Sequence, residues 1–170
     1  MLSLFSLLSI LFVGISILIL YFSQRPYSFW IGKKFTTLSL RPLAFITIQL
    51  LAIGIGLDIV STWAGVNDTQ GVTNAILSMR ENVVLGIILL AIGAIGEELF
   101  FRGILFPIIG MIPSSLLFSF FHTGYGSIIQ LIGSFIVGII LCRARVLNES
   151  ILPGILGHFT YNAIILFILV

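Results

Sequence analysis

The stretch AIGEELFFRG, residues 94–103, places two adjacent carboxylates and a guanidinium at the end of a long apolar run. Burying such charges is costly unless they are paired. In an α-helix Glu98 and Arg102 are four residues apart and share a face, so we expect them to form an ion pair. Glu97 lies about 100° around the helix from Glu98 and has no obvious local partner. Because ionisable groups inside membranes are usually functional, Glu97 is the candidate for chemistry, and Glu98 and Arg102 are expected to support it.

The composition of the whole chain indicates a membrane protein. Of its 170 residues, 59% are hydrophobic and only 8% are charged, whereas about 25% are charged in a typical soluble protein. The net charge of +2 is too small to indicate nucleic-acid binding. Cys142 is the only cysteine, which excludes an internal disulfide and a cysteine metal cluster.

Apolar segments divide the chain into about six predicted membrane helices. They cover residues 1–22, 43–63, 82–106, 113–122, 127–142 and 153–170. The segment 64–81 carries Gly and Asn turn signals and is predicted to be a polar loop. We therefore expect an all-α, polytopic transmembrane helix bundle, with residues 1–170 forming a single membrane domain.

The distribution of basic residues predicts the orientation of this bundle. The connectors expected to face the cytoplasm contain Arg25, Lys33, Lys34, Arg41, Arg143 and Arg145, and an outside loop contains Arg80. This arrangement follows the positive-inside rule if both termini lie outside. We expect an integral membrane protein, located in the plasma membrane of a prokaryote.

The polar residues of three predicted helices reach similar depths in this arrangement. At 1.5 Å per residue, Glu97 and His158 lie about 8 Å below the cytoplasmic surface, and His122 and Asn162 about 13 Å below it. His122 and His158 are the only histidines in the chain. The sequence therefore predicts that these side chains gather around one hydrated site near the cytoplasmic side.

Small residues mark surfaces where another helix can approach closely. Gly86 and Gly93 share a face with Glu97, and Gly154 shares a face with His158. The residues Gly126, Gln130, Ser134 and Gly138 recur every four positions and are expected to form a close-packing seam.

A glutamate and a histidine beside one water form a general base that can activate it for attack on a carbonyl. A second imidazole and an amide can donate hydrogen bonds to the resulting oxyanion. Peptide hydrolysis inside the membrane therefore fits this set of residues. The signatures of other proteases are absent, since the sequence contains neither an H-E-x-x-H zinc motif nor a Gly-x-Ser-Gly nucleophile.

Three short motifs on separate predicted helices resemble one known family. EELFFR matches E-E-x-x-x-R, FSFFH matches F-x-x-x-H and HFTYN matches H-x-x-x-N. Together they resemble the CPBP (Abi) family of CAAX-type and bacteriocin-processing membrane proteases, over a motif-bearing catalytic core at residues 82–170. The resemblance implies a glutamic-type intramembrane endopeptidase that uses neither a metal nor another cofactor.

The resemblance also implies a role for each motif residue. Glu97 and His122 would activate water, while His158 and Asn162 would stabilise the oxyanion. Glu98 and Arg102 would support the site, and Phe118 would pack beside His122. The substrate is expected to be a peptide or membrane protein in the lipid bilayer, such as a prenylated CAAX-like tail, a leader peptide or a membrane-anchored regulator.

Two alternative functions remain open at this point. Glu97, His122 and His158 form a legitimate ligand set for a catalytic zinc ion, which would make the protein a membrane metalloprotease. The same cluster could instead serve only for packing in a membrane scaffold, an immunity-type protein or a transporter subunit.

Overall fold

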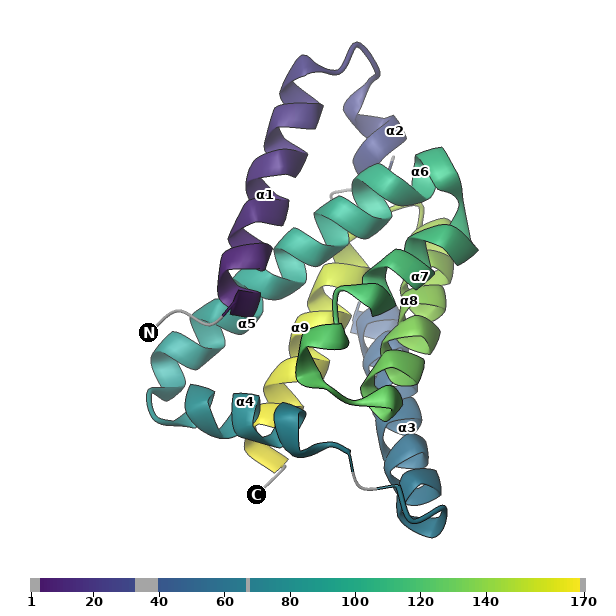
Figure 1. The fold of residues 1–170 in the computed structure, drawn as a ribbon. Helices are drawn as coiled ribbons and strands as arrows, with labels where there is room; N and C mark the ends of the chain where they lie inside the picture. The colour runs from purple at the N-terminus through teal and green to yellow at the C-terminus, as the bar shows by residue number, and fades with distance from the viewer. Residues whose placement is uncertain (1–3, 33–39, 67, 169–170) are drawn as a thin grey trace.

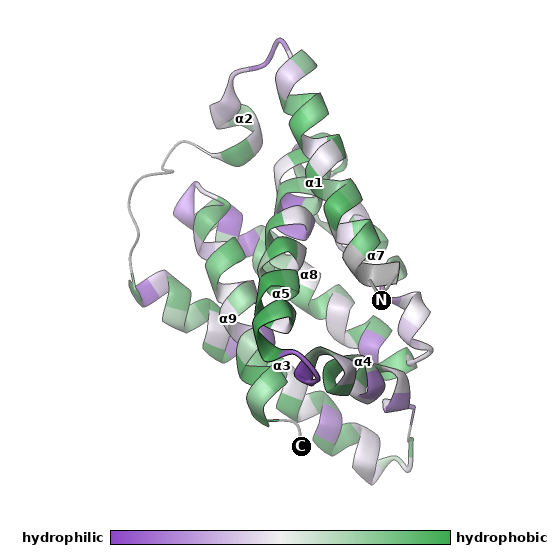
Figure 2. Cartoon of the chain, turned by 90° about the vertical axis from the view of Figure 1, so that its left-hand side faces the viewer, coloured by the Kyte–Doolittle hydropathy of each residue, from purple (hydrophilic) through white to green (hydrophobic). Residues whose placement is uncertain are grey.

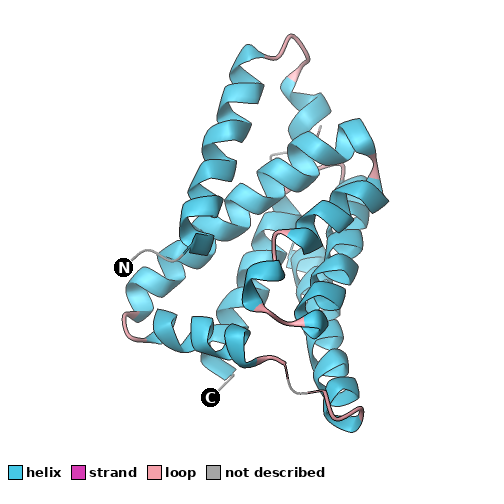
Figure 3. Cartoon of the chain, in the orientation of Figure 1, coloured by secondary structure: helices cyan, strands magenta, loops and turns pink. Residues whose placement is uncertain are grey.

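The computed structural model describes residues 4–32, 40–66 and 68–168. Within these residues helices joined by short turns make up most of the structure, and there is no β-strand (Figure 3), apart from an isolated bridge between Gly32 and Ser150. The helices are α1 (Leu4–Phe22), α2 (Tyr27–Ile31), α3 (Leu40–Trp63), α4 (Gln70–Arg80), α5 (Val83–Glu97), η1 (Glu98–Leu105), α6 (Phe106–Ile109), α7 (Met111–Phe120), η2 (Thr123–Tyr125), α8 (Ile128–Asn148) and α9 (Leu152–Ile168). The predicted all-α fold is confirmed.

Three helices are long and apolar enough to cross a membrane. They are Leu40–Trp63, the continuous run Val83–Ile109, and Ile128–Asn148. Two shorter apolar helices, Leu7–Phe22 and Leu152–Ile168, accompany them. In Figure 2 hydrophobic colour dominates α1 and α5, whereas hydrophilic colour gathers in the turn between α1 and α2 and around α4. The protein is therefore an integral membrane protein.

The segment 64–81 was predicted to be a loop, and this prediction was wrong because α4 forms there. Val72, Ala75, Ile76 and Met79 follow the spacing of one helical face. Tertiary contacts outweigh the Gly and Asn turn signals. A Cβ on Gly86 of α5 would come within 2.6 Å of the Met79 carbonyl oxygen, so the absent side chain lets α4 pack on α5.

Several other boundaries also differ from the predictions: α3 begins at Leu40, α7 begins at Met111 and the run from Val83 continues to Ile109. α8 extends to Asn148 rather than ending at residue 142, so Arg143 and Arg145 lie within the helix. The Arg145 guanidinium stabilises this extension by donating 2.9 Å hydrogen bonds to the carbonyls of Phe29 and Trp30 at the end of α2. α7 ends at Phe120, so His122 lies just beyond that helix. Lys33 and Lys34, together with the predicted helix ends at residues 1–3 and 169–170, fall outside the described residues.

The long run from Val83 changes its helical geometry at the motif. Residues Glu98–Leu105 form a π-helix, in which each turn contains more than the 3.6 residues of an α-helix. The Ser114 hydroxyl donates a 2.7 Å hydrogen bond to the Phe101 carbonyl in this segment, which ties it to α7. The wider turn directs Glu98, Phe101 and Arg102 into the interior, where all three are buried.

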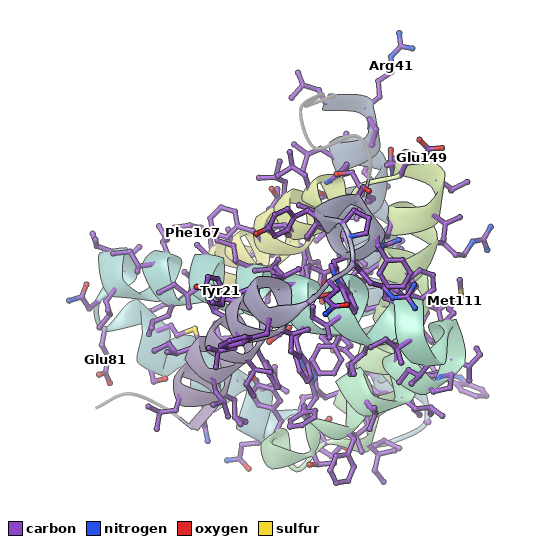
Figure 4. All side chains as sticks on the ribbon, turned by 90° about the horizontal axis from the view of Figure 1, so that it is seen from above. Tyr21, Arg41, Glu81, Met111, Glu149 and Phe167 are labelled. Carbon is purple, nitrogen blue, oxygen red and sulfur yellow. The ribbon has the colours of Figure 1, made fainter. Side chains whose placement is uncertain are left out.

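The bundle is centred on α9, which packs against α3, α5 and α8 (Figure 1). Close approaches between helices occur at glycines. The predicted seam is present only in part. A Cβ on Gly138 of α8 would come within 2.8 Å of the Ser115 side chain of α7, whereas Gly126 lies in the turn before α8, has φ 66° and makes no close approach. By contrast, the labelled charged side chains Arg41, Glu81 and Glu149 lie at the edge of the molecule and point away from it (Figure 4).

Candidate active site

The expected ion pair between Glu98 and Arg102 is present inside the bundle. Glu98 Oε1 accepts a 2.9 Å hydrogen bond from Arg102 Nη1, and each residue is only 1% exposed. The Arg102 guanidinium carbon also lies 4.1 Å from the centre of the Phe118 ring, which is a cation–π contact. Both partners are removed from solvent, so each depends on the other to offset the cost of burying its charge.

His158 of α9 lies between the two glutamates of the motif. Its Nδ1 atom is 3.2 Å from Glu98 Oε1, and its Nε2 atom is 3.9 Å from Glu97 Oε2. A Cβ on Gly154, one turn earlier in α9, would lie 3.3 Å from Glu98 Oε2. The glycine therefore allows α9 to approach the carboxylate closely enough for this hydrogen bond.

His122 is oriented by the helix that precedes it. Its Nδ1 atom lies 2.8 Å from the Phe118 carbonyl oxygen, and the two rings are 4.6 Å apart, as expected for this pair. A carbonyl oxygen can only accept, so Nδ1 carries the ring proton. In the neutral imidazole the free lone pair is therefore on Nε2.

Glu97 and His122 line the same small cavity. The remaining lining residues are Leu8, Ser9, Phe12, Phe101 and Phe121. The cavity has a volume of about 10 Å³, which is about the space needed for one water molecule. The Glu97 side chain is 18% exposed, in contrast to Glu98.

The structure thus brings three of the four proposed catalytic side chains together. Glu97 shares the cavity with His122 and faces His158, although the three come from different parts of the chain. Asn162 lies one turn after His158 on α9 and is half-buried. It has no hydrogen bond to the other three residues in the described part of the chain.

Two features of the site were missed by sequence reasoning. The π-helix has no signature that distinguishes EELFFRGIL from an α-helical stretch. The wall formed by α1 was also missed, although Gly93 did indicate that some helix approaches there. A Cβ on Gly93 would lie 3.6 Å from the Ser9 hydroxyl of α1, and one on Gly96 would lie 2.5 Å from the Ser9 carbonyl oxygen.

The zinc alternative requires three ligands around one point. Among residues 4–32, 40–66 and 68–168, no group of three His, Cys, Asp or Glu side chains is arranged to hold a metal ion. The geometry gives this alternative no support, and no step below is assigned to a metal.

Comparison with known proteins adds a family to this geometry. The part of the chain that matches a family model extends over residues 79–164, and it contains all three motifs. No curated protein and no solved structure matches the chain. Because the matched part is just over half of its 170 residues, the chain belongs to the type II CAAX prenyl endopeptidase Rce1-like family.

Proposed function

We propose that the protein is a glutamic-type intramembrane endopeptidase, in which Glu97 and His122 activate a water molecule that attacks a peptide carbonyl. The observation that carries this proposal is the shared cavity. A carboxylate and an imidazole nitrogen with a free lone pair line a space of single-water size. Membership of a prenyl endopeptidase family supports peptide hydrolysis as the reaction.

The proposed first step is general-base catalysis. The water oxygen bonds to the carbonyl carbon, one water proton passes to the Glu97 carboxylate, and the carbonyl oxygen becomes an oxyanion. His122 Nε2 accepts a hydrogen bond from the same water and orients it. In the second step the C–N bond breaks and the proton held by Glu97 passes to the leaving nitrogen. The products are a carboxylic acid and an amine.

His158 is the proposed oxyanion donor, and its hydrogen bond to Glu98 restricts how it can act. Glu98 is ion-paired with Arg102, so it accepts the Nδ1 proton of His158. Only Nε2, which faces Glu97, can then reach the substrate. To donate from Nε2 as well, the ring must carry a proton on each nitrogen. The Asn162 amide is the proposed second donor, and Glu98 with Arg102 positions His158.

The proposed substrate is a peptide segment of a membrane-associated protein. It reaches the site from the cytoplasmic side, according to the orientation expected from the basic residues. The motif residues lie among apolar helices, so the segment must itself enter a largely apolar environment. Whether it carries a prenyl group is decided by comparing prenylated and unprenylated forms of one peptide.

The experiment that tests the proposal is a cleavage assay with fluorescent membrane peptides in liposomes. Glu97→Gln and His122→Asn are each expected to lower kcat by at least about 100-fold, since general acid–base groups contribute about 10²- to 10⁴-fold. Glu81→Gln is the matched control, because Glu81 is an exposed glutamate outside the motif. Cleavage that continues at the normal rate in Glu97→Gln would refute the proposal. Activity that disappears in a chelator and returns with zinc would favour the metalloprotease alternative.

A further inference from the structure

The cavity beside Glu97 cannot accommodate a peptide in the conformation described here. Its accessible volume of about 10 Å³ suits one water molecule. For hydrolysis, a substrate carbonyl carbon must come within about 3–3.5 Å of the attacking oxygen. At least one wall of the cavity must therefore move before a peptide can bind.

The walls differ in the interactions that hold them. Leu8, Ser9 and Phe12 form one wall, and all three belong to α1. The opposite wall comes from the segment between Glu97 and His122, in which the buried ion pair and the hydrogen bond from Ser114 to Phe101 fix the chain. α1 also lies outside residues 79–164, the part that matches the family.

α1 is the wall that borders the lipid. It stands at the edge of the bundle, where it crosses α5 and packs mainly on α5 and η1 (Figure 1). Its outward-facing side chains are apolar and exposed, including Leu7, Leu11 and Leu18. In a bilayer these side chains contact lipid, and lipid is as apolar as the interior. Moving α1 aside therefore exchanges helix contacts for lipid contacts and avoids the larger cost of exposure to water.

Phe12 is the side chain by which α1 enters the site. It is 4% exposed and lies against three other rings. Its ring is stacked on Phe100 at 4.7 Å and meets the edges of Phe101 at 5.3 Å and Phe121 at 5.1 Å. We call Phe100, Phe101 and Phe121 the aromatic box. Two members of this box also line the cavity with Glu97 and His122.

We propose that α1 is a movable wall of the active site, and that the aromatic box receives an aromatic side chain of the substrate when Phe12 withdraws. The inference rests on the proposed peptidase function and adds a substrate class to it. That class is a peptide with an aromatic residue beside the scissile bond. Phe12 fills the box in the resting state, so α1 must separate from α5 in each catalytic cycle.

A reversible covalent link between α1 and α5 tests the movement. Cysteines at Ser9 and Gly93 are the pair to use, because a Cβ on Gly93 would lie 3.6 Å from Ser9 Oγ, so the two thiols would meet across the contact between α1 and α5. The native Cys142 is buried and does not interfere. The single variants Ser9→Cys and Gly93→Cys are the matched controls under the same oxidant.

The oxidised double variant is expected to cleave the peptide at least about 10-fold more slowly than the same sample after reduction. Reduction should restore the rate to that of the single variants. Equal rates in the oxidised and reduced samples would overturn the movable wall.

A peptide pair tests the aromatic box. The two peptides differ only in Phe or Ala beside the scissile bond. Aromatic pair contacts predict a preference of about 2- to 12-fold in kcat/KM for the Phe peptide, beyond the effect of its size, so a Leu peptide is the size control. Phe12→Leu should lower KM for the Phe peptide. No preference for Phe over Leu, with an unchanged KM in Phe12→Leu, would overturn the box.

A binding assay separates this inference from the proposed function. Fluorescence anisotropy measures binding of the labelled Phe peptide to the double-cysteine protein that also carries Glu97→Gln. Binding only after reduction supports the movable wall even if Glu97 is later shown not to be the base. Equal binding in both redox forms overturns it, whatever the cleavage assay shows.

Discussion

Removal of the Arg102 guanidinium is expected to destabilise the protein strongly. Arg102 and Glu98 are each 1% exposed and joined by a 2.9 Å hydrogen bond. The variant Arg102→Met keeps most of the apolar side-chain volume but leaves the Glu98 charge without its cationic partner. Breaking a buried pair from one side costs about 3–5 kcal/mol. We expect a loss in this range for Arg102→Met, reduced to the extent that His158 compensates at 3.2 Å.

The same reasoning predicts that a second substitution rescues the first. In Glu98→Gln with Arg102→Met neither member of the pair carries a charge, and the Gln oxygen can still accept the proton from His158. The double variant should recover at least about 1–2 kcal/mol relative to Arg102→Met alone, because contacting residues show interaction energies of about 0.5–3 kcal/mol.

Unfolding by SDS in mixed micelles, followed by circular dichroism, measures these differences. Arg41→Met is the control, because Arg41 is exposed at the start of α3 and should change stability little. If Glu98→Gln destabilises the Arg102→Met variant by as much as it destabilises the wild-type protein, the argument is refuted. That result would show that the ion pair contributes no coupling energy.

Two further predictions concern close contacts made by glycines. Gly138→Leu should separate α7 from α8, since even a Cβ at this position would come within 2.8 Å of Ser115. The variant is expected to unfold at a lower SDS concentration than the wild-type protein. Unchanged stability would show that the contact between Gly138 and Ser115 does not hold the two helices together. Gly32→Ala should undock α2, because Gly32 has φ 95° and ψ 166° and a Cβ would clash with the Glu149 carbonyl oxygen. This backbone region is essentially restricted to glycine and costs other residues about 1–3 kcal/mol. Trp30 of α2 is buried in the docked state, so chymotrypsin should cleave after Trp30 faster than in wild type, and an unchanged rate would disprove the role of Gly32.

Several features of this protein follow from local sequence alone. Inside a bilayer, an apolar segment can form all its backbone hydrogen bonds only as a helix or as part of a closed barrel. The apolar runs of this chain have the length of helices, so the sequence predicted helices. The pairing of Glu98 with Arg102 follows from a spacing of four residues. The contact between Phe118 and His122, which have the same spacing, was implied by the motif resemblance. Each of these relationships lies within one helix or its end, so neighbouring residues are enough to predict it.

Other features were decided only by the tertiary structure, because they depend on contacts between segments that are distant in the sequence. α4 forms where turn residues predicted a loop, since Gly86 provides a surface on which it packs. The position of His158 between Glu97 and Glu98 depends on the approach of α9 at Gly154. The wall that α1 builds beside Glu97 carries no motif at all, because apolar residues that face lipid and those that face a cavity are chemically alike. Only their neighbours in space distinguish them.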